Sequence, residues 1–294
     1  MRDKITKSLS KFVQRIGPKY IAGPAVEDAI RVSRQIHRCG WSSTICPWDS
    51  PHESPTVVAS RYRKALHAIG AGMGDCYLSI KVPSLNYDFD VLKELLEIAC
   101  QHNTRIHLDS LGPDTASASF AFLEKALKTY SNLGCTLPSR WRRSLADAEV
   151  AIQLGLPVRV VKGQWPDPTH PDDDSRASYL ALVDVLSGRA ASVGIATHDV
   201  KLAVASIVKL KNTATRCELE QLYGLPLRIA QVATPLRTNV RVYIPYGHAY
   251  LPYALSEIRK RPVVVGWLLR DALFNKVYLP DAPISTRTRD SRAK

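Results

Sequence analysis

Several short apolar runs of this 294-residue chain end at an ionisable or polar side chain. Residues 79–81 read Ser-Ile-Lys, residues 107–109 read His-Leu-Asp and residues 196–198 read Ala-Thr-His. The side chains at or just after such runs are Lys81, Asp109, Arg140, Lys162, His198, Glu220 and Tyr243. One of them alone would be no more than a strand end that reaches water. Together, at successive strand ends, they predict a polar cup above a packed barrel, where the site of such a fold is built.

The segment of residues 240–262 predicts a second group of side chains near this site. Residues 240–244 alternate between apolar and larger polar side chains, as a strand does, and a proline and a glycine then interrupt it. On the helix expected next, Tyr253, Ser256 and Glu257 stand at i, i+3 and i+4 and so share one face. Tyrosine rings such as Tyr243 and Tyr253 offer apolar area with a polar tip, which suits a small heterocycle, although core packing is their ordinary role.

Eight short apolar runs alternate with longer helical patterns, which predicts an α/β fold. The expected strands are Ser43–Cys46, Cys76–Val82, Arg105–Asp109, Leu133–Leu137, Val158–Lys162, Ser192–Thr197, Thr215–Leu219 and Val240–Ile244. The expected helices include Phe89–Gln101, Ala116–Tyr130, Ser144–Gln153, Ser175–Leu186 and Lys201–Lys209. The pattern favours a (β/α)8 TIM-like barrel. The alternative is an open doubly wound sheet, which is disfavoured because no glycine-rich phosphate loop follows the first run.

Three segments are expected along the chain. Residues 1–40 form an N-terminal helical extension, with Val26, Ile30, Ser33 and His37 on one stripe that packs across the bottom or the side of the barrel. Residues 41–280 form the barrel. Residues 281–294 are rich in Ser, Thr, Arg and Asp and predict a disordered basic tail.

The composition is that of a soluble globular protein, with 45% hydrophobic and 23% charged residues. No apolar run approaches the roughly 18–20 residues that span a bilayer, and the first residues do not resemble a secretion signal. The six cysteines are scattered without metal-ligand spacing. We therefore expect a cytoplasmic protein with reduced thiols and no metal site.

The formal net charge of +13 has two interpretations. It is either an ordinary solvated surface or an attraction to anionic partners. No nucleic-acid motif accompanies the charge, so no nucleic-acid partner is expected. The N-terminal stretch places Ile5, Leu9, Phe12 and Ile16 at helical spacing between lysines, as in a helix that rests on an anionic bilayer. Peripheral contact with the inner face of a membrane is the partner that this pattern predicts.

Several segments resemble proline dehydrogenase, a flavin enzyme that oxidises proline. Bacterial members read much like YVPYG, with a tyrosine ten residues after the first one, and Tyr243 and Tyr253 reproduce that spacing. Further similar segments are SIKV (79–82), HLD (107–109), PVRVVKG (157–163), ATH (196–198) and ELEQLYG (218–224). Each segment is short, but their order and their placement at strand ends extend the resemblance over residues 43–275.

The resemblance implies a barrel that binds FAD non-covalently and passes electrons from proline to a quinone or another acceptor in proline catabolism. The residues that it places at the flavin are Arg159, Lys162, His198 and Glu220, and those that it places at the reacting substrate are Lys81, Asp109, Tyr243 and Tyr253. A cation near the flavin pyrimidine edge would stabilise the reduced ring. Proline itself would yield 1-pyrroline-5-carboxylate.

The chain departs from the family pattern mainly on the substrate side. Ser256 and Glu257 replace an arginine pair that holds the substrate carboxylate, Arg140 and Trp165 stand where the family has tyrosines, and Glu220 replaces a glutamine. Arg140 could serve as a relocated anion anchor. Two alternatives therefore stay open: the same flavin chemistry on an amine without a free carboxylate, and a non-catalytic barrel that acts as a binding or regulatory protein.

Overall fold

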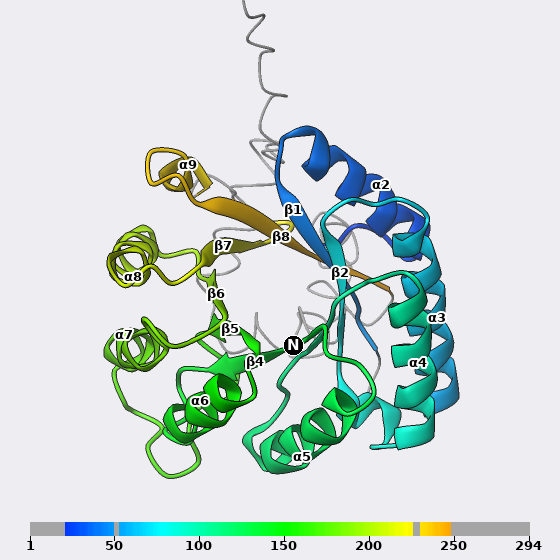
Figure 1. Ribbon diagram of the computed structural model, residues 1–294, viewed down its shortest axis with the longest axis horizontal. Helices are drawn as coiled ribbons and strands as arrows, with labels where there is room; N and C mark the ends of the chain where they lie inside the picture. Colours follow the sequence, from blue (N-terminus) through cyan, green and yellow to red (C-terminus); the bar gives the residue numbers. More distant parts are fainter. Residues whose placement is uncertain (1–20, 50–52, 226–229, 248–294) are drawn as a thin grey trace, which may run out of the picture.

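The computed structural model of the chain describes residues 21–49, 53–225 and 230–247. Eight parallel strands form a closed barrel in which each strand pairs with the next and β8 pairs with β1 (Figure 1). The strands are β1 (Ser42–Pro47), β2 (Cys76–Ile80), β3 (Ile106–Leu108), β4 (Leu133–Pro138), β5 (Pro157–Val161), β6 (Ser192–Ala196), β7 (Cys217–Leu222) and β8 (Asn239–Tyr246). The closed barrel confirms the predicted (β/α)8 fold and excludes the open sheet.

Helices connect the strands and surround the barrel (Figure 1). They are α3 (Pro55–Gly70), α4 (Phe89–Gln101), α5 (Ala116–Leu127), α6 (Ser144–Gln153), α7 (Ser175–Leu186), α8 (Val200–Asn212) and the short α9 (Ala230–Ala233), with 3-10 turns at Val82–Leu85 and Pro113–Thr115. The bounds of α4, α6 and α7 agree with the predictions. In residues 21–49, 53–225 and 230–247, no helix combines the length and apolarity needed to cross a bilayer.

Side-chain caps explain several helix starts. Asp174 accepts hydrogen bonds from the backbone N–H groups of Arg176 and Ala177 at the start of α7. Thr115 precedes α5 but makes no such cap. Its hydroxyl donates instead to the carbonyl of Gly112 at 2.8 Å.

Helix α2 (Val26–Arg38) precedes the barrel in the chain and packs against β1 and β8 (Figure 1). Ile30 and Ser33 of the predicted stripe are buried. The ring of His37 forms a 3.0 Å hydrogen bond with the hydroxyl of Ser43 on β1. This helix therefore covers the side of the barrel where β8 closes on β1. The lysine-rich start, the predicted helix with Tyr253 and the C-terminal tail lie outside the described residues.

The strands present opposite kinds of side chain to their two faces. Ile45, Leu78, Ile106 and Leu133 align across neighbouring strands and are fully buried in the apolar layer shared with the helices. The alternate residues face the barrel interior. That interior is polar, with Tyr77, Ser79, His107, Thr136, Arg159, Glu220 and Arg241 all buried within it. Polar side chains therefore continue from the predicted cup at the strand ends down into the packed barrel interior.

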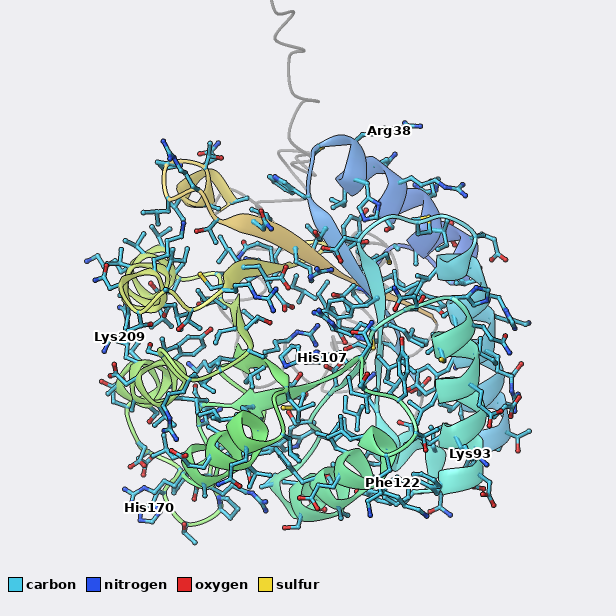
Figure 2. All side chains as sticks on the ribbon, in the orientation of Figure 1. Arg38, Lys93, His107, Phe122, His170 and Lys209 are labelled. Atoms are coloured by element: carbon cyan, nitrogen blue, oxygen red, sulfur yellow. The ribbon has the colours of Figure 1, made fainter. Side chains whose placement is uncertain are left out.

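Two glycines make room for this polar interior. A Cβ atom on Gly194 of β6 would lie 2.3 Å from Oε1 of Glu220, and one on Gly134 of β4 would lie 2.5 Å from Nδ1 of His107. Figure 2 shows His107 near the middle of the barrel, while Lys209 lies among the outer helices. Any larger residue at these two positions would displace a buried polar side chain.

Candidate active site

Arg159 of β5 lies at the centre of a charged cluster inside the barrel. Its side chain is 3% exposed. Nε donates to Oε2 of Glu220 at 2.6 Å, and Nη1 donates to Oδ1 of Asp109 at 2.7 Å. Nη1 also donates to the hydroxyl of Ser79, and Nη2 donates to that of Tyr77, both at 3.1 Å. The guanidinium thus links side chains from β2, from β7 and from just beyond β3 through the barrel interior.

Asp109, the first residue beyond β3, has one saturated and one less occupied oxygen. Its Oδ1 accepts from Arg159, from Ser79 at 2.8 Å and from Thr136 at 3.1 Å. Its Oδ2 accepts from the hydroxyl of Tyr243 at 2.7 Å and from the thiol of Cys46 at 4.0 Å. The side chain is 12% exposed. Because the thiol is a weak and distant donor, Oδ2 is the less strongly bonded of the two oxygens.

His107 supports this carboxylate from below. The Thr136 hydroxyl donates its proton to Asp109, so it accepts from Nε2 of His107, 3.1 Å away. Burial and the nearby positive charge of Arg159 hold the pKa of His107 well below its ordinary value. His107 is therefore a neutral ring protonated on Nε2, and it positions Thr136 rather than exchanging protons near neutral pH.

Lys81 and Cys46 form the upper part of the cluster. Nζ of Lys81 donates to Sγ of Cys46 at 3.3 Å and to the carbonyl of Pro47 at 3.2 Å. Burial raises the pKa of the Cys46 thiol to about 11. Burial alone would lower the pKa of Lys81, but the nearby Cys46, Asp49 and Asp109 raise it overall. The pair is thus a neutral thiol beside a permanent ammonium ion.

Arg241 of β8 closes the lower end of the interior. Its guanidinium donates to Glu218 at 2.7 Å and to Asp75 at 2.8 Å, and it lies 4.3 Å from the centre of the Tyr77 ring. Burial raises the pKa of Tyr77 to about 12. Because its hydroxyl stays protonated, Tyr77 connects the lower ion pairs to Arg159.

The pair of Arg159 and Glu220 determines the charge of the interior. Burial raises the pKa of Glu220, and the guanidinium of Arg159 opposes that shift. Burial would lower the pKa of Arg159, yet Glu220 and Asp109 hold it well above its ordinary value. Arg159 is consequently a permanent cation, and the ionised form of Glu220 depends on it.

A second group of predicted residues lies around the open C-terminal end of the barrel. It consists of Arg140, Lys162, Trp165 and His198, which follow β4, β5 and β6. Lys162 is exposed and the others are half-buried. Nε2 of His198 accepts from the backbone N–H of Leu222 at 3.0 Å, so the proton of the neutral ring lies on Nδ1. We call these four residues the rim.

Asp167 fixes the loop that carries Trp165. Its carboxylate accepts from the backbone N–H groups of Arg142 and Thr169, each at 2.9 Å. Burial opposes the effect, but these hydrogen bonds hold the pKa of Asp167 well below its ordinary value. The indole of Trp141 also donates to the carbonyl of Trp165 at 3.1 Å. The loop after β5 is therefore attached to the segment after β4.

The structure separates the predicted site residues into three groups. Lys81, Asp109, Arg159, Glu220 and Tyr243 meet in the interior cluster, and Arg140, Lys162, Trp165 and His198 form the rim. Tyr253, Ser256 and Glu257 lie outside the described residues. Glu220 was expected beyond its strand, but β7 continues to Leu222, and Glu220 therefore points into the barrel.

Sequence reasoning missed several members of the cluster. Ser79, Thr136, Tyr77 and Cys46 all contact predicted residues. Ser79 and Tyr77 stand two and four residues before Lys81, so they face the same side of β2. Counting back in steps of two from each strand end would have identified them.

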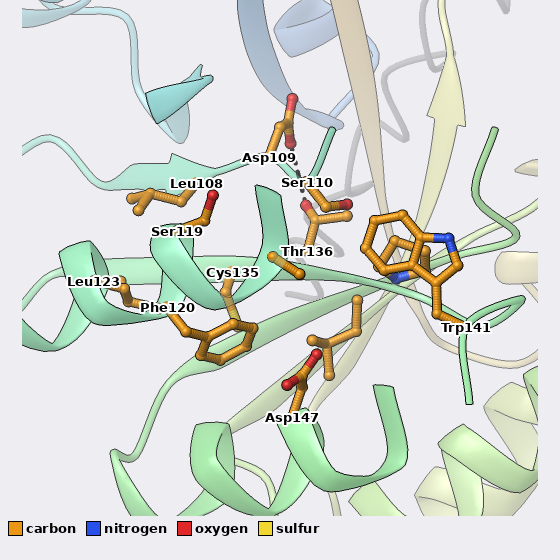
Figure 3. Close-up of a pocket in the computed structure, with 13 residues that line it drawn as sticks. Leu108, Asp109, Ser110, Ser119, Phe120, Leu123, Cys135, Thr136, Trp141 and Asp147 are labelled. Atoms are coloured by element: carbon orange, nitrogen blue, oxygen red, sulfur yellow. Dashed lines mark hydrogen bonds between the residues drawn. The ribbon is translucent and has the colours of Figure 1, made fainter. Parts of the chain in front are cut away.

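A small cavity lies between α5 and strands β3 and β4 (Figure 3). Asp109 and Thr136 border it at one end, and Trp141 and Asp147 also line it. Its volume of about 20 Å³ holds one water molecule. No ring-sized compound fits there, so a substrate has to reach Asp109 from the open end of the barrel.

The rim provides groups that fit an anionic cofactor with a flat ring, as predicted for FAD. Arg140 and Lys162 supply positive charge, and Trp165 supplies an aromatic face. The hydroxyl of Ser139 and Oε1 of Gln221 are buried at strand ends and make no hydrogen bond within the described ranges. Unsatisfied buried polar atoms of this kind are ones that a polar ligand can complete.

The fold and the site define a (β/α)8 barrel with a charged, carboxylate-bearing interior. Over 291 residues the chain is 24% identical to Proline dehydrogenase 1 of Bacillus subtilis (strain 168), covering 91% of this chain and 95% of the relative. It is 23% identical over 282 residues to Proline dehydrogenase of Deinococcus radiodurans, covering 89% and 91%. No protein-family model matches the chain. The resemblance to proline dehydrogenases is confirmed over nearly the whole chain.

Solved structures of proline utilization A share the fold. The protein from Bdellovibrio bacteriovorus superposes with a TM-score of 0.73 at 15% identity, over 85% of this chain and 33% of its own. The protein from Corynebacterium freiburgense gives 0.69 at 17% identity, over 94% and 36%. This chain therefore spans about a third of those longer proteins and corresponds to their barrel.

Proposed function

We propose that the protein is an FAD-dependent oxidoreductase that oxidises the CH–NH bond of proline or a proline-like cyclic amine to the imine. The observation that carries the proposal is the cluster of Asp109, Arg159 and Tyr243 at the C-terminal end of the barrel. It occurs in a chain that matches proline dehydrogenases over 91% of its length. With proline as substrate, the product is 1-pyrroline-5-carboxylate.

In this proposal the rim holds the cofactor and the cluster holds the substrate. Lys162 and His198 contact FAD, with Arg159 and Glu220 below it. Bound FAD supplies the acceptor for the hydride of the carbon next to nitrogen. Asp109, oriented by Tyr243, contacts the amine. The pairing of Arg159 with two carboxylates keeps this carboxylate fixed without a mobile counter-ion.

The purified protein is expected to be yellow, and acid or heat should release free FAD because no covalent attachment is proposed. A visible absorption spectrum before and after denaturation, followed by chromatography of the released flavin, checks this. The control is the same spectrum after incubation with added FAD and gel filtration. A colourless protein that takes up no FAD would leave only a binding or regulatory role for the barrel.

The proposed electron acceptor is a quinone or another acceptor, reached from a peripheral position on an anionic membrane. We expect the full chain to sediment with anionic vesicles at low salt, because surface charge attracts lysines within a Debye length. Deletion of residues 1–19 should abolish sedimentation. Neutral vesicles are the control. Equal sedimentation of the deletion variant would assign the basic N-terminus to an ordinary solvated surface.

A further inference from the structure

The charged side chains of the interior cluster, counted without the rim cations Arg140 and Lys162, carry no surplus positive charge. Asp49, Asp109 and Glu220 provide three carboxylates against the two cations Lys81 and Arg159, which leaves one net negative charge. The neighbouring pair of Arg61 and Glu53 adds none. If Glu220 took up a proton, the sum would reach zero and still not be positive.

Both cations of the cluster are already engaged by the protein. Four N–H groups of Arg159 point at Glu220, Asp109, Ser79 and Tyr77, and a guanidinium has five. Lys81 donates to a thiol and to a backbone carbonyl. These contacts leave one N–H of Lys81 and one of Arg159 for other acceptors, and a substrate carboxylate that reached them would bring a second negative charge beside Asp109.

The carboxylate of Asp109 suits a cation. Its Oδ2 accepts from the hydroxyl of Tyr243 at 2.7 Å and, more weakly, from the thiol of Cys46 at 4.0 Å, and the side chain is 12% exposed. An ammonium N–H can replace the long thiol contact with a charge-assisted hydrogen bond. The ring of Tyr243 beside it offers the apolar surface that a saturated ring requires.

We propose that the substrate of this site is a cyclic amine without a carboxylate, bound as a cation against Asp109. The proposal rests on the proposed function for the reaction, while the charge argument stands on the cluster alone. In this proposal, Asp109 selects the substrate by its charge. The rim cations Arg140 and Lys162 then serve the cofactor rather than the substrate.

Three ring compounds of similar size separate charge from shape. Pyrrolidine is a cation at neutral pH, and cyclopentanecarboxylate is an anion. L-proline carries both charges. Thermal unfolding of the purified, FAD-supplemented protein is measured against the concentration of each. Pyrrolidine should raise Tm, cyclopentanecarboxylate should not, and proline should require at least about tenfold higher concentration than pyrrolidine.

Two variants test whether the bound amine contacts Asp109. Asp109→Asn should remove the stabilisation by pyrrolidine, whereas Glu97→Gln, an exposed position on α4, should keep it. The comparison of ligands in the wild-type protein decides the proposal even if Asp109→Asn does not fold. Proline or cyclopentanecarboxylate binding as tightly as pyrrolidine would overturn it, as would no response to pyrrolidine. Loss of proline binding in Arg140→Met would then identify Arg140 as the carboxylate anchor.

The two proposals fail in different ways. If the protein binds no flavin, the proposed function fails, but the unfolding shifts with the three rings still test the charge of the site. If bound flavin is reduced anaerobically by proline at lower concentration than by pyrrolidine, the proposed function stands and the inference is wrong. Reduction by pyrrolidine at about tenfold lower concentration than by proline supports both.

Discussion

Replacement of Arg159 by methionine is expected to lower the free energy of unfolding by about 3–5 kcal/mol. The change removes the cation from a site where Glu220 and Asp109 are buried within 2.7 Å of it. Two carboxylates are then left without their charged partner. Chemical denaturation followed by circular dichroism measures the loss. A loss below about 1 kcal/mol would show that the pair contributes little to stability.

The pH dependence of this variant has a defined direction. Burial already raises the pKa of Glu220, and without Arg159 the main opposing charge is gone and the weaker effect of Arg241 remains. A group whose pKa is raised in the folded state adds stability below its unfolded pKa and loses that contribution as pH rises through the folded pKa. The loss in free energy of unfolding caused by Arg159→Met should therefore be smaller at mildly acidic pH and larger near neutral pH. Adding Glu220→Gln to this variant should recover part of the lost stability.

Two matched variants isolate the effect of burial. Arg189→Met removes an arginine that pairs with Glu149 on the surface, and it should leave stability unchanged. Lys162→Met removes an exposed cation of the rim. It should also leave stability unchanged but weaken FAD binding about tenfold or more, and lower the reduction potential. Unchanged flavin affinity and potential in Lys162→Met would mean that this lysine does not contact the flavin.

Introduction of arginine at Ser256 and Glu257 together is expected to lower the apparent KM for proline about a hundredfold. The resemblance places this pair on the helix face that meets the substrate carboxylate. The change supplies bidentate donors and removes a like charge, while kcat should change little if the contact is equal in ground and transition states. Steady-state kinetics with proline measures the effect.

The matched control carries lysine at both positions. Lysine restores the positive charge without the planar bidentate geometry, so it should improve KM less than arginine. The contrary outcome is a wild-type KM typical of a dedicated proline enzyme that the arginine pair worsens. That result would place the carboxylate anchor elsewhere, at Arg140, Lys260 or Arg261.

The elements of the fold were largely predictable because they depend on local patterns. Apolar runs marked all eight strands within a few residues, and periodic apolar positions gave the bounds of α4, α6 and α7. Helix α3 was not among the expected helices, although Val58, Tyr62, Leu66 and Ile69 form a helical stripe along its buried face. Closure of the sheet depends on pairing β1 with β8, almost 200 residues apart, and the count of eight strand–helix units predicted it without showing which residues pair.

The candidate site was predictable at the strand ends and not inside the barrel. Residues such as Lys81 and Asp109 follow directly from strand termini. The ion pair of Arg159 and Glu220 joins residues 61 positions apart on strands that are not neighbours, so it depends on register and closure together. Ser79 and Thr136, which form hydrogen bonds with Arg159 and Asp109, carry no charge and belong to no recognisable sequence motif. Local patterns therefore identify which residues reach the site, and the closed barrel determines which of them pair.

The central claim is that this barrel oxidises a cyclic amine with bound flavin, and anaerobic reduction of the purified protein tests it most directly. The visible spectrum is recorded while pyrrolidine or proline is added in the absence of oxygen. We expect the oxidised flavin absorption to disappear and the amine to be recovered as an imine lighter by the two hydrogens lost. A protein that binds FAD but keeps its oxidised spectrum with every cyclic amine, or that binds no FAD, would contradict the account.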